Sequence, residues 1–103
     1  MKAAKKKSLE KSGYTVGGVD QFLGLSPQES EIIDMKLALA RGIAEIRKKK
    51  RLTQLQVAGK IGSSQSRVAK LEKGDPTVSI DLMVKALLSM GESRKTLARL
   101  IST

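Results

Sequence analysis

A glycine at position 62 separates two short stretches that each have the start and stop signals of a helix, and this pairing constrains the fold most. Thr53 and Gln56 can form a capping box, in which side chains and backbone amides pair reciprocally at a helix start. The first helix is predicted from Gln54 to Ile61 and stops at Gly62. The sequence thus predicts a short helix followed by a tight glycine turn.

The second short helix is predicted to begin at Ser63 or Ser64, run through Glu72 and stop at Gly74. Small Ala58 allows the two helices to cross closely, whereas a residue other than Gly62 would lose about 1 kcal/mol in the left-handed turn. The spacing of the aliphatic side chains turns them inward, so that the second helix protrudes rigidly. These side chains are Val57, Ile61, Val68 and Leu71.

Three further helices are predicted around this pair. A capping box of Ser26 and Glu29 opens a long first helix, from Pro27 to about Lys50, with proline at its first position. After the loop opened by Asp75 and Pro76, Ser79 can cap a helix over 80–90, and Ser93 can cap a last helix over 94–101. No strand is indicated, so the expected fold class is all-α with five helices.

The first half of the long helix is apolar over a wider face than one small core requires. A larger internal core or a docked N-terminal arm would cover this face, but we favour an interface with a second chain, most simply another copy. We expect a compact five-helix body to leave four residues of this half uncovered: Ile32, Ile33, Leu37 and Ala40.

The basic charge is concentrated in two parts of this 103-residue chain, whose formal net charge is +10. Residues 43–74 hold nine basic and two acidic residues, and this fixed basic surface is typical of a protein that neutralises phosphates. Residues 1–11 hold five lysines and one glutamate. We therefore divide the chain into a flexible basic arm, residues 1–25, and a folded domain, residues 26–103.

Composition also narrows the class of function. The absence of cysteine and histidine excludes disulfides, thiolate nucleophiles and histidine bases, and we expect neither a metal nor another cofactor. A chain this short fits a binding module better than an enzyme. Neither a membrane span nor a signal peptide is indicated, so we expect a cytoplasmic protein with no membrane partner.

From Leu52-Thr53-Gln54 to Glu72-Lys73-Gly74, the sequence resembles the phage-repressor-like helix-turn-helix family that includes the lambda repressor and Cro. The resemblance extends back to Ile43 and forward to Met90-Gly91. It implies a lambda-repressor-like five-helix domain whose third helix enters the major groove of double-stranded DNA.

The resemblance also implies roles for individual residues. Gln54 matches a position that contacts the DNA backbone, Gln65 can pair with adenine, and Arg67 can pair with guanine or phosphate. Arg47 and Glu72 match an ion pair that ties the first helix to the third. The expected DNA-binding residues are Gln54, Ser64, Gln65, Ser66, Arg67, Lys70 and Lys73, and the structural motif consists of Ala58, Gly62, Val68, Leu71, Arg47 and Glu72.

Two positions depart from the family pattern. Arg51 replaces a glycine that commonly precedes Leu-Thr-Gln, so this turn is expected to be reshaped or strained by about 1 kcal/mol. Gly59 lies within a predicted helix, which suggests close approach of a phosphate or another chain.

The leading hypothesis is a sequence-specific transcriptional regulator, a repressor, that binds a palindromic DNA site as a homodimer and associates with the nucleoid when bound. One alternative is the antitoxin of a toxin–antitoxin pair, with a small toxin protein as partner and autoregulation of its operon. A second alternative is a protein-interaction adaptor built on the same scaffold, whereas an enzyme is a remote third.

Overall fold

The computed structural model describes residues 24–102. They form five α-helices and no strand: α3 (Pro27–Lys49), α4 (Gln54–Lys60), α5 (Gln65–Glu72), α6 (Ile80–Ser89) and α7 (Arg94–Ile101). The predicted all-α, five-helix fold class is thereby confirmed, and the observed bounds lie close to the predicted ones. The predicted arm, residues 1–25, lies outside the described residues except for Gly24 and Leu25.

The chain divides into two compact units between Ile32 and Ile33, inside α3. In the first unit, the predicted capping box opens α3. The Glu29 backbone N–H donates to Ser26 Oγ at 3.1 Å, and the Ser26 backbone N–H donates to Glu29 Oε1 at 2.8 Å. The second unit holds the remainder of α3 and all of α4–α7.

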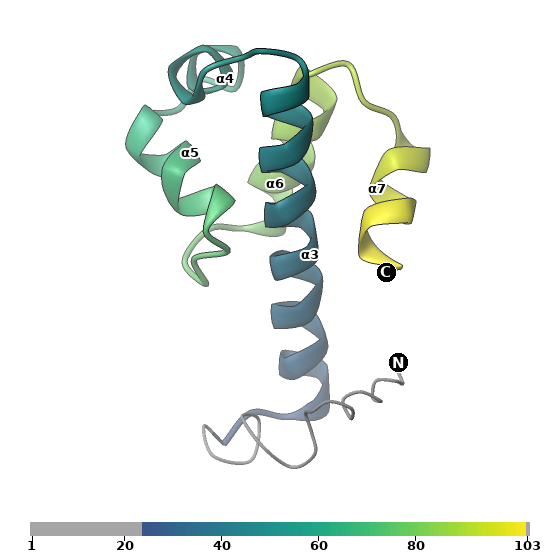
Figure 1. Ribbon diagram of the computed structural model, residues 1–103. Coiled ribbons are helices and arrows are strands. Elements are labelled where there is room, and N and C mark those ends of the chain that lie inside the picture. Colours follow the sequence, from purple (N-terminus) through teal and green to yellow (C-terminus); the bar gives the residue numbers. More distant parts are fainter. Residues whose placement is uncertain (1–23, 103) are drawn as a thin grey trace. The chain divides into compact units, whose positions relative to one another are not determined.

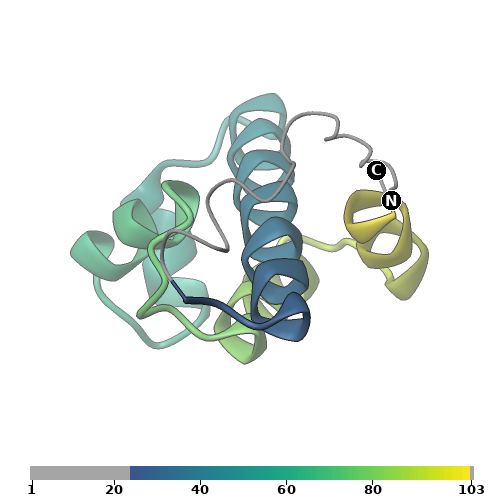
Figure 2. The same ribbon diagram turned by 90° about the horizontal axis from the view of Figure 1, so that it is seen from below.

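Within the second unit, α3 lies between α7 on one side and the α4–α5 pair on the other (Figures 1 and 2). The core includes Met83 and Met90, and it also includes Ala40, of which only 2% is exposed. The expectation that the five-helix body leaves Ala40 uncovered is therefore wrong, because this methyl group is small enough to pack inside. The largest fully buried side chains are Leu39, Ile43, Leu71, Met83, Leu87, Val57, Val68 and Val78.

The turns between helices follow the sequence signals with one exception. Gly62 adopts φ +65°. Arg51 adopts φ +60°, so of the two expected outcomes for this turn the structure has the strained left-handed conformation. Ser93 has the backbone conformation of a helix cap, but its side chain makes no capping hydrogen bond. At this helix start, the hydroxyl of Thr96 instead donates to Glu92 Oε1 at 2.8 Å.

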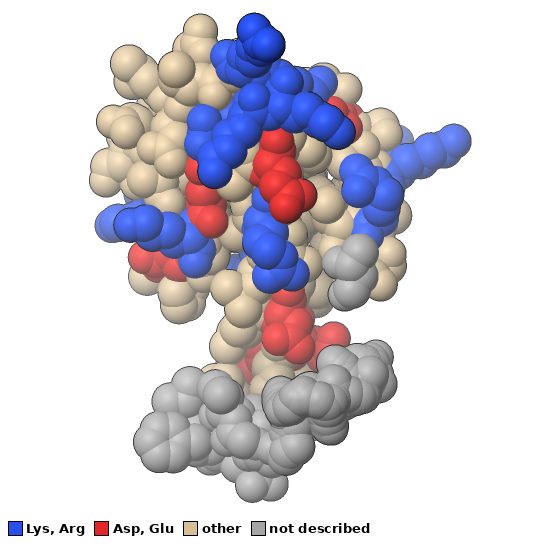
Figure 3. All heavy atoms as spheres, in the orientation of Figure 1, with Lys and Arg blue, Asp and Glu red and all other residues tan. Residues whose placement is uncertain are grey.

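Basic side chains occupy the last turn of α3, at Arg47, Lys48 and Lys49. Figure 3 shows Lys and Arg side chains gathered over this end of α3 and over α7. Positive charge is therefore present on both sides of the second unit, and α5 is only one of the elements that carry it.

Candidate nucleic-acid interface

The start of each short helix is closed by a hydroxyl side chain. Thr53 Oγ1 accepts a hydrogen bond from the backbone N–H of Gln56 at 3.0 Å, and the Thr53 backbone N–H donates to Gln56 Oε1 at 2.8 Å. At the start of α5, Ser64 Oγ accepts from the backbone N–H of Arg67 at 3.2 Å. Both helices therefore begin at defined residues, which fixes the direction of their first side chains.

The inner side of the α4–α5 pair is buried. Ala58 is 1% exposed, and its carbonyl oxygen accepts a hydrogen bond from the backbone N–H of Ser63, after the glycine turn, at 2.9 Å. Val68 and Leu71 of α5 are fully buried. Because both sit in a close-packed core, α5 cannot rock without opening a cavity. The helix is held rigidly from its inner side.

The outer side of the pair carries the polar residues that the sequence singled out. Gln54, at the start of α4, is partly exposed, whereas the predicted residues of α5 and its C-cap are exposed. The exposed set comprises Ser64, Gln65, Ser66, Arg67, Lys70 and Lys73. These side chains are accessible to a large partner.

Arg47 and Glu72 join the end of α3 to the end of α5. Arg47 Nε lies 2.5 Å from Glu72 Oε2 and Nη2 lies 3.0 Å from Oε1, which makes the pair bidentate. Only 13% of the Arg47 side chain and 8% of the Glu72 side chain are exposed. A third guanidinium N–H donates to the Leu52 carbonyl at 2.8 Å. The pair is shielded from water and geometrically well satisfied.

The ion pair continues into a chain of glutamine hydrogen bonds. Gln54 Nε2 donates to Glu72 Oε1 at 3.1 Å, and Gln65 Nε2 donates to Gln54 Oε1 at 3.1 Å. The chain of side chains therefore runs from Arg47 in α3, through Glu72 and Gln54, to Gln65 on the exposed surface. The orientation of the Gln65 amide depends on this chain.

Electrostatics favour the charged form of both members of the ion pair. Burial alone would raise the pKa of Glu72, but hydrogen bonds from Arg47 and Gln54, together with the positive charges of Arg47 and Lys48, lower it below its ordinary value. The hydrogen bond to Glu72 raises the pKa of Arg47, although desolvation opposes the rise. Glu72 consequently remains an acceptor for both Arg47 and Gln54 at neutral pH.

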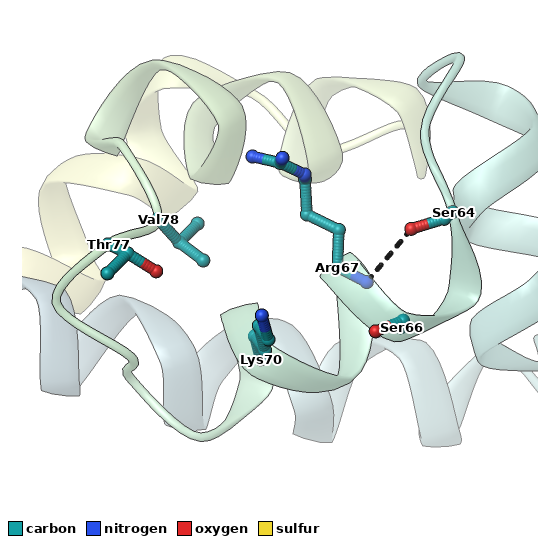
Figure 4. A pocket seen from close by; sticks show the side chains of 6 residues that line it. All are labelled: Ser64, Ser66, Arg67, Lys70, Thr77 and Val78. Atoms are coloured by element: carbon teal, nitrogen blue, oxygen red, sulfur yellow. Dashed lines mark hydrogen bonds between the residues drawn. The ribbon is translucent and has the colours of Figure 1, made fainter.

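A cleft of about 200 Å³ lies beside α5. It is lined by four of the predicted residues, Ser64, Ser66, Arg67 and Lys70, and by Thr77 and Val78 from the loop that follows α5. Figure 4 shows Arg67 and Lys70 on α5 and Thr77 across the cleft from that helix. Two cationic side chains and the hydroxyls of two serines make this cleft suitable for an anionic oxygen group.

Asp75 holds the loop that contributes Thr77. Its Oδ1 accepts from the backbone N–H of Thr77 at 2.8 Å and from the hydroxyl at 2.6 Å. These bonds lower the pKa of Asp75 below its ordinary value, an effect that the charges of Lys70 and Lys36 reinforce. Lys36 also donates to the Pro76 carbonyl at 3.0 Å, so α3 supports the loop directly.

The predicted residues thus fall into separate groups. Gln54 and Gln65 are joined by a hydrogen bond, the four residues named above line the cleft, and Lys73 belongs to neither group. Sequence reasoning missed Thr77 and Val78. Asp75 and Pro76 indicated a turn there, but they gave no sign that the loop folds back along α5.

Gly59, within α4, lies on an open helix surface, where an added Cβ would meet nothing within 4 Å.

A comparison with known families decides what this arrangement is. Residues 43–93 match the family model described as helix-turn-helix, of the Cro/C1 type. These residues form a Cro/C1-type helix-turn-helix domain. The matched range contains α4, the glycine turn, α5 and α6, together with the end of α3, which confirms the resemblance found in the sequence. No match was found among curated proteins or among solved structures.

The match to this helix-turn-helix family supports a general class of function, because the family consists of DNA-binding regulators. The chain therefore carries a DNA-binding helix-turn-helix domain. Between residues 24 and 102, no helix combines the length and apolar character that crossing a membrane demands.

Proposed function

We propose that this protein is a transcriptional repressor that binds a specific, palindromic double-stranded DNA site as a homodimer, in the cytoplasm and in association with the nucleoid. The observation that carries the proposal is the hydrogen-bond chain that orients Gln65 at the exposed start of α5. A protein that occupies a groove excludes other proteins from the same base pairs, and this occlusion is the proposed mode of repression.

The Gln65 amide is suited to reading adenine. One hydrogen of its Nε2 is donated to Gln54, which leaves the second hydrogen and the amide oxygen for a partner. Adenine presents N7 as an acceptor and its exocyclic amine as a donor in the major groove, and a glutamine amide pairs with both. Because the chain to Arg47 already holds this amide, little side-chain entropy is lost on binding.

The cleft residues supply contacts to the DNA backbone in this proposal. Arg67 and Lys70 offer positive charge to phosphate oxygens, and the hydroxyls of Ser64 and Ser66 offer further donors. Gln54 retains a second amide hydrogen for a phosphate while it orients Gln65. Lys73, exposed at the end of α5, contributes to the general attraction. Affinity should therefore fall steeply as salt is raised.

The first test is selection of bound sequences from random duplex DNA at a stated salt concentration, followed by binding measurements with Gln65→Ala. This variant should lose about 1–3 kcal/mol on the selected site and little on random DNA, because the bidentate adenine contact exists only in the specific complex. The matched control is Gln28→Ala, the same change at an exposed position of α3.

If Gln65→Ala lost equal binding free energy on the selected site and on random DNA, Gln65 would not read a base. If Gln65→Ala had no effect on either substrate, and binding did not weaken with salt, the adaptor alternative would replace the regulator.

The homodimer rests on apolar side chains of α3 that remain uncovered. Ile32 is 42% exposed and Leu37 is 41% exposed, which is unusual for two large aliphatic residues so close in sequence. Ile32→Ser combined with Leu37→Ser should weaken dimerisation at least about ten-fold in sedimentation equilibrium, because each substitution removes buried apolar area. Leu88→Ser, at a residue that is 53% exposed on α6, is the control.

If the folded double variant dimerised as tightly as the wild type, Ile32 and Leu37 of α3 would not lie in the dimer interface. A wild-type protein that remained monomeric at tens of micromolar would contradict the homodimer itself.

A further inference from the structure

A second surface with the character of a binding site lies between α3 and α7. This groove has a volume of about 330 Å³ and is lined by Gly42, Glu45, Ile46, Lys49, Arg99 and Leu100. Because α7 and α5 lie on opposite sides of α3, this helix separates the groove from α5 (Figures 1 and 2). The proposed DNA contacts therefore do not use it.

The groove has an apolar floor and a basic rim. A Cβ atom at position 42 would lie only 2.4 Å from a methyl carbon of Leu100, so glycine is what allows α7 to seat this side chain against α3. Partly buried Ile46 continues the floor, and the exposed side chains of Lys49, Arg99 and Glu45 flank it, which leaves one positive charge in excess. The basic character extends beyond the rim, over the end of α3 and over α7 (Figure 3).

The same chain carries a segment with the opposite charge and exposed apolar side chains. Residues 29–37, in the first half of α3, contain three carboxylates, Glu29, Glu31 and Asp34, and one lysine. Ile32 and Leu37 of this segment are each about two-fifths exposed. A helix with aliphatic side chains and acidic neighbours suits a groove with an apolar floor and a basic rim.

We propose that residues 29–37 of a second copy of this chain dock in the α3–α7 groove. Each copy has one such segment and one such groove, so two copies can exchange the contact reciprocally and form a closed, two-fold pair. The inference rests on the proposed function and deepens it, because it names both surfaces of the homodimer. Helix α5 of each copy remains exposed for DNA.

Other occupants fit the groove less well. An apolar floor offers nothing to a sugar–phosphate backbone. The N-terminal residues 1–11, with five lysines and one glutamate, would be repelled by the rim. The acidic segment of α3 is attracted to Lys49 and Arg99 and also has aliphatic side chains to bury.

A charge exchange tests the contact with the full chain. One variant reverses the rim by Lys49→Glu and Arg99→Glu, and the other reverses the net charge of the segment by Glu31→Lys combined with Asp34→Lys. Each variant alone should dimerise at least about ten-fold more weakly than the wild type, because like charges then face each other. An equimolar mixture should recover a tight heterodimer, in which both contacts again join opposite charges. Sedimentation equilibrium measures the association, and thermal melts verify folding.

The matched control is Lys60→Glu combined with Lys85→Glu, at exposed positions of α4 and α6. It changes the net charge by as much as the rim variant does and should leave dimerisation intact. The proposal is overturned if the variants dimerise like the wild type or if the mixture does not recover. With a wild-type dimer, either result leaves the proposed function standing. A monomeric wild type overturns both the docking and the homodimer, while base reading by Gln65 is judged separately on DNA.

Discussion

Replacing Glu72 with alanine should destabilise the protein strongly, since this carboxylate joins three separate parts of the second unit. It accepts two hydrogen bonds from Arg47 and one from Gln54. Its removal would leave the Arg47 guanidinium with the Leu52 carbonyl as its only partner among these bonds. A largely buried cation would then lack its counter-charge.

The magnitude of the loss follows from how well the pair is shielded. Exposed ion pairs contribute about 0–1 kcal/mol, whereas breaking a fully buried one costs about 3–5 kcal/mol. With side chains 13% and 8% exposed, the Arg47–Glu72 pair lies nearer the buried limit. We expect Glu72→Ala to lower the free energy of unfolding by about 2–3 kcal/mol, which corresponds to roughly 10–20 °C in Tm.

Thermal unfolding followed by circular dichroism measures this loss. The control is Lys50→Ala, which breaks the more exposed Lys50–Glu92 pair, 3.2 Å between Nζ and Oε2, and should cost less than about 1 kcal/mol. If Glu72→Ala lowered Tm no more than Lys50→Ala, the Arg47–Glu72 pair would not be a buried interaction and the reasoning would be refuted.

Two further predictions concern pH and the turn before α4. Because the pKa of Glu72 is lowered in the folded state, folded protein binds its proton less readily than unfolded protein, so this stabilisation is present above the ordinary pKa of 4.5 and is lost as pH falls through the folded value. Urea unfolding at a series of pH values should show a smaller acid-induced drop for Glu72→Gln than for the wild type, and equal drops would contradict the shift. Arg51→Gly should raise stability by about 0.5–1 kcal/mol, since φ +60° strains any residue with a Cβ. A Tm equal to or below that of the wild type would show that the arginine side chain contributes more than the strain costs.

Local signals in the sequence were sufficient to predict the elements of this fold. Capping residues such as Thr53 and Ser64, and the glycine stops, act within a few residues of themselves, so the positions where helices begin and end can be derived without knowing their neighbours. The same locality explains why a strained or reshaped turn was expected at Arg51, which adopts the left-handed conformation. The one failed cap, Ser93, stands where Thr96 and Glu92 pair with each other.

Contacts between distant segments required the tertiary structure. The hydrogen bond between Gln54 and Gln65 spans 11 positions, and the bond between Gln54 and Glu72 spans 18. Family resemblance named these residues separately, but no local pattern places one amide against another. The contacts among these side chains depend on how closely α4 and α5 cross. The packing of Ala58, Val68 and Leu71 determines that distance.

Burial was likewise decided by packing rather than by pattern. The apolar spacing of α3 grouped Ala40 with Leu37, yet the structure buries Ala40 and leaves Leu37 41% exposed. Periodicity identifies the side of a helix, but the neighbouring helices set how much of that side is covered. The loop residues Thr77 and Val78 reach the cleft for a similar reason, since Lys36 and Asp75 hold their loop against α3 and α5. The sequence by itself therefore determined the helices and their glycine turns, whereas the tertiary packing decided which side chains meet and which remain accessible, because contact energy depends on distances between segments that no local pattern encodes.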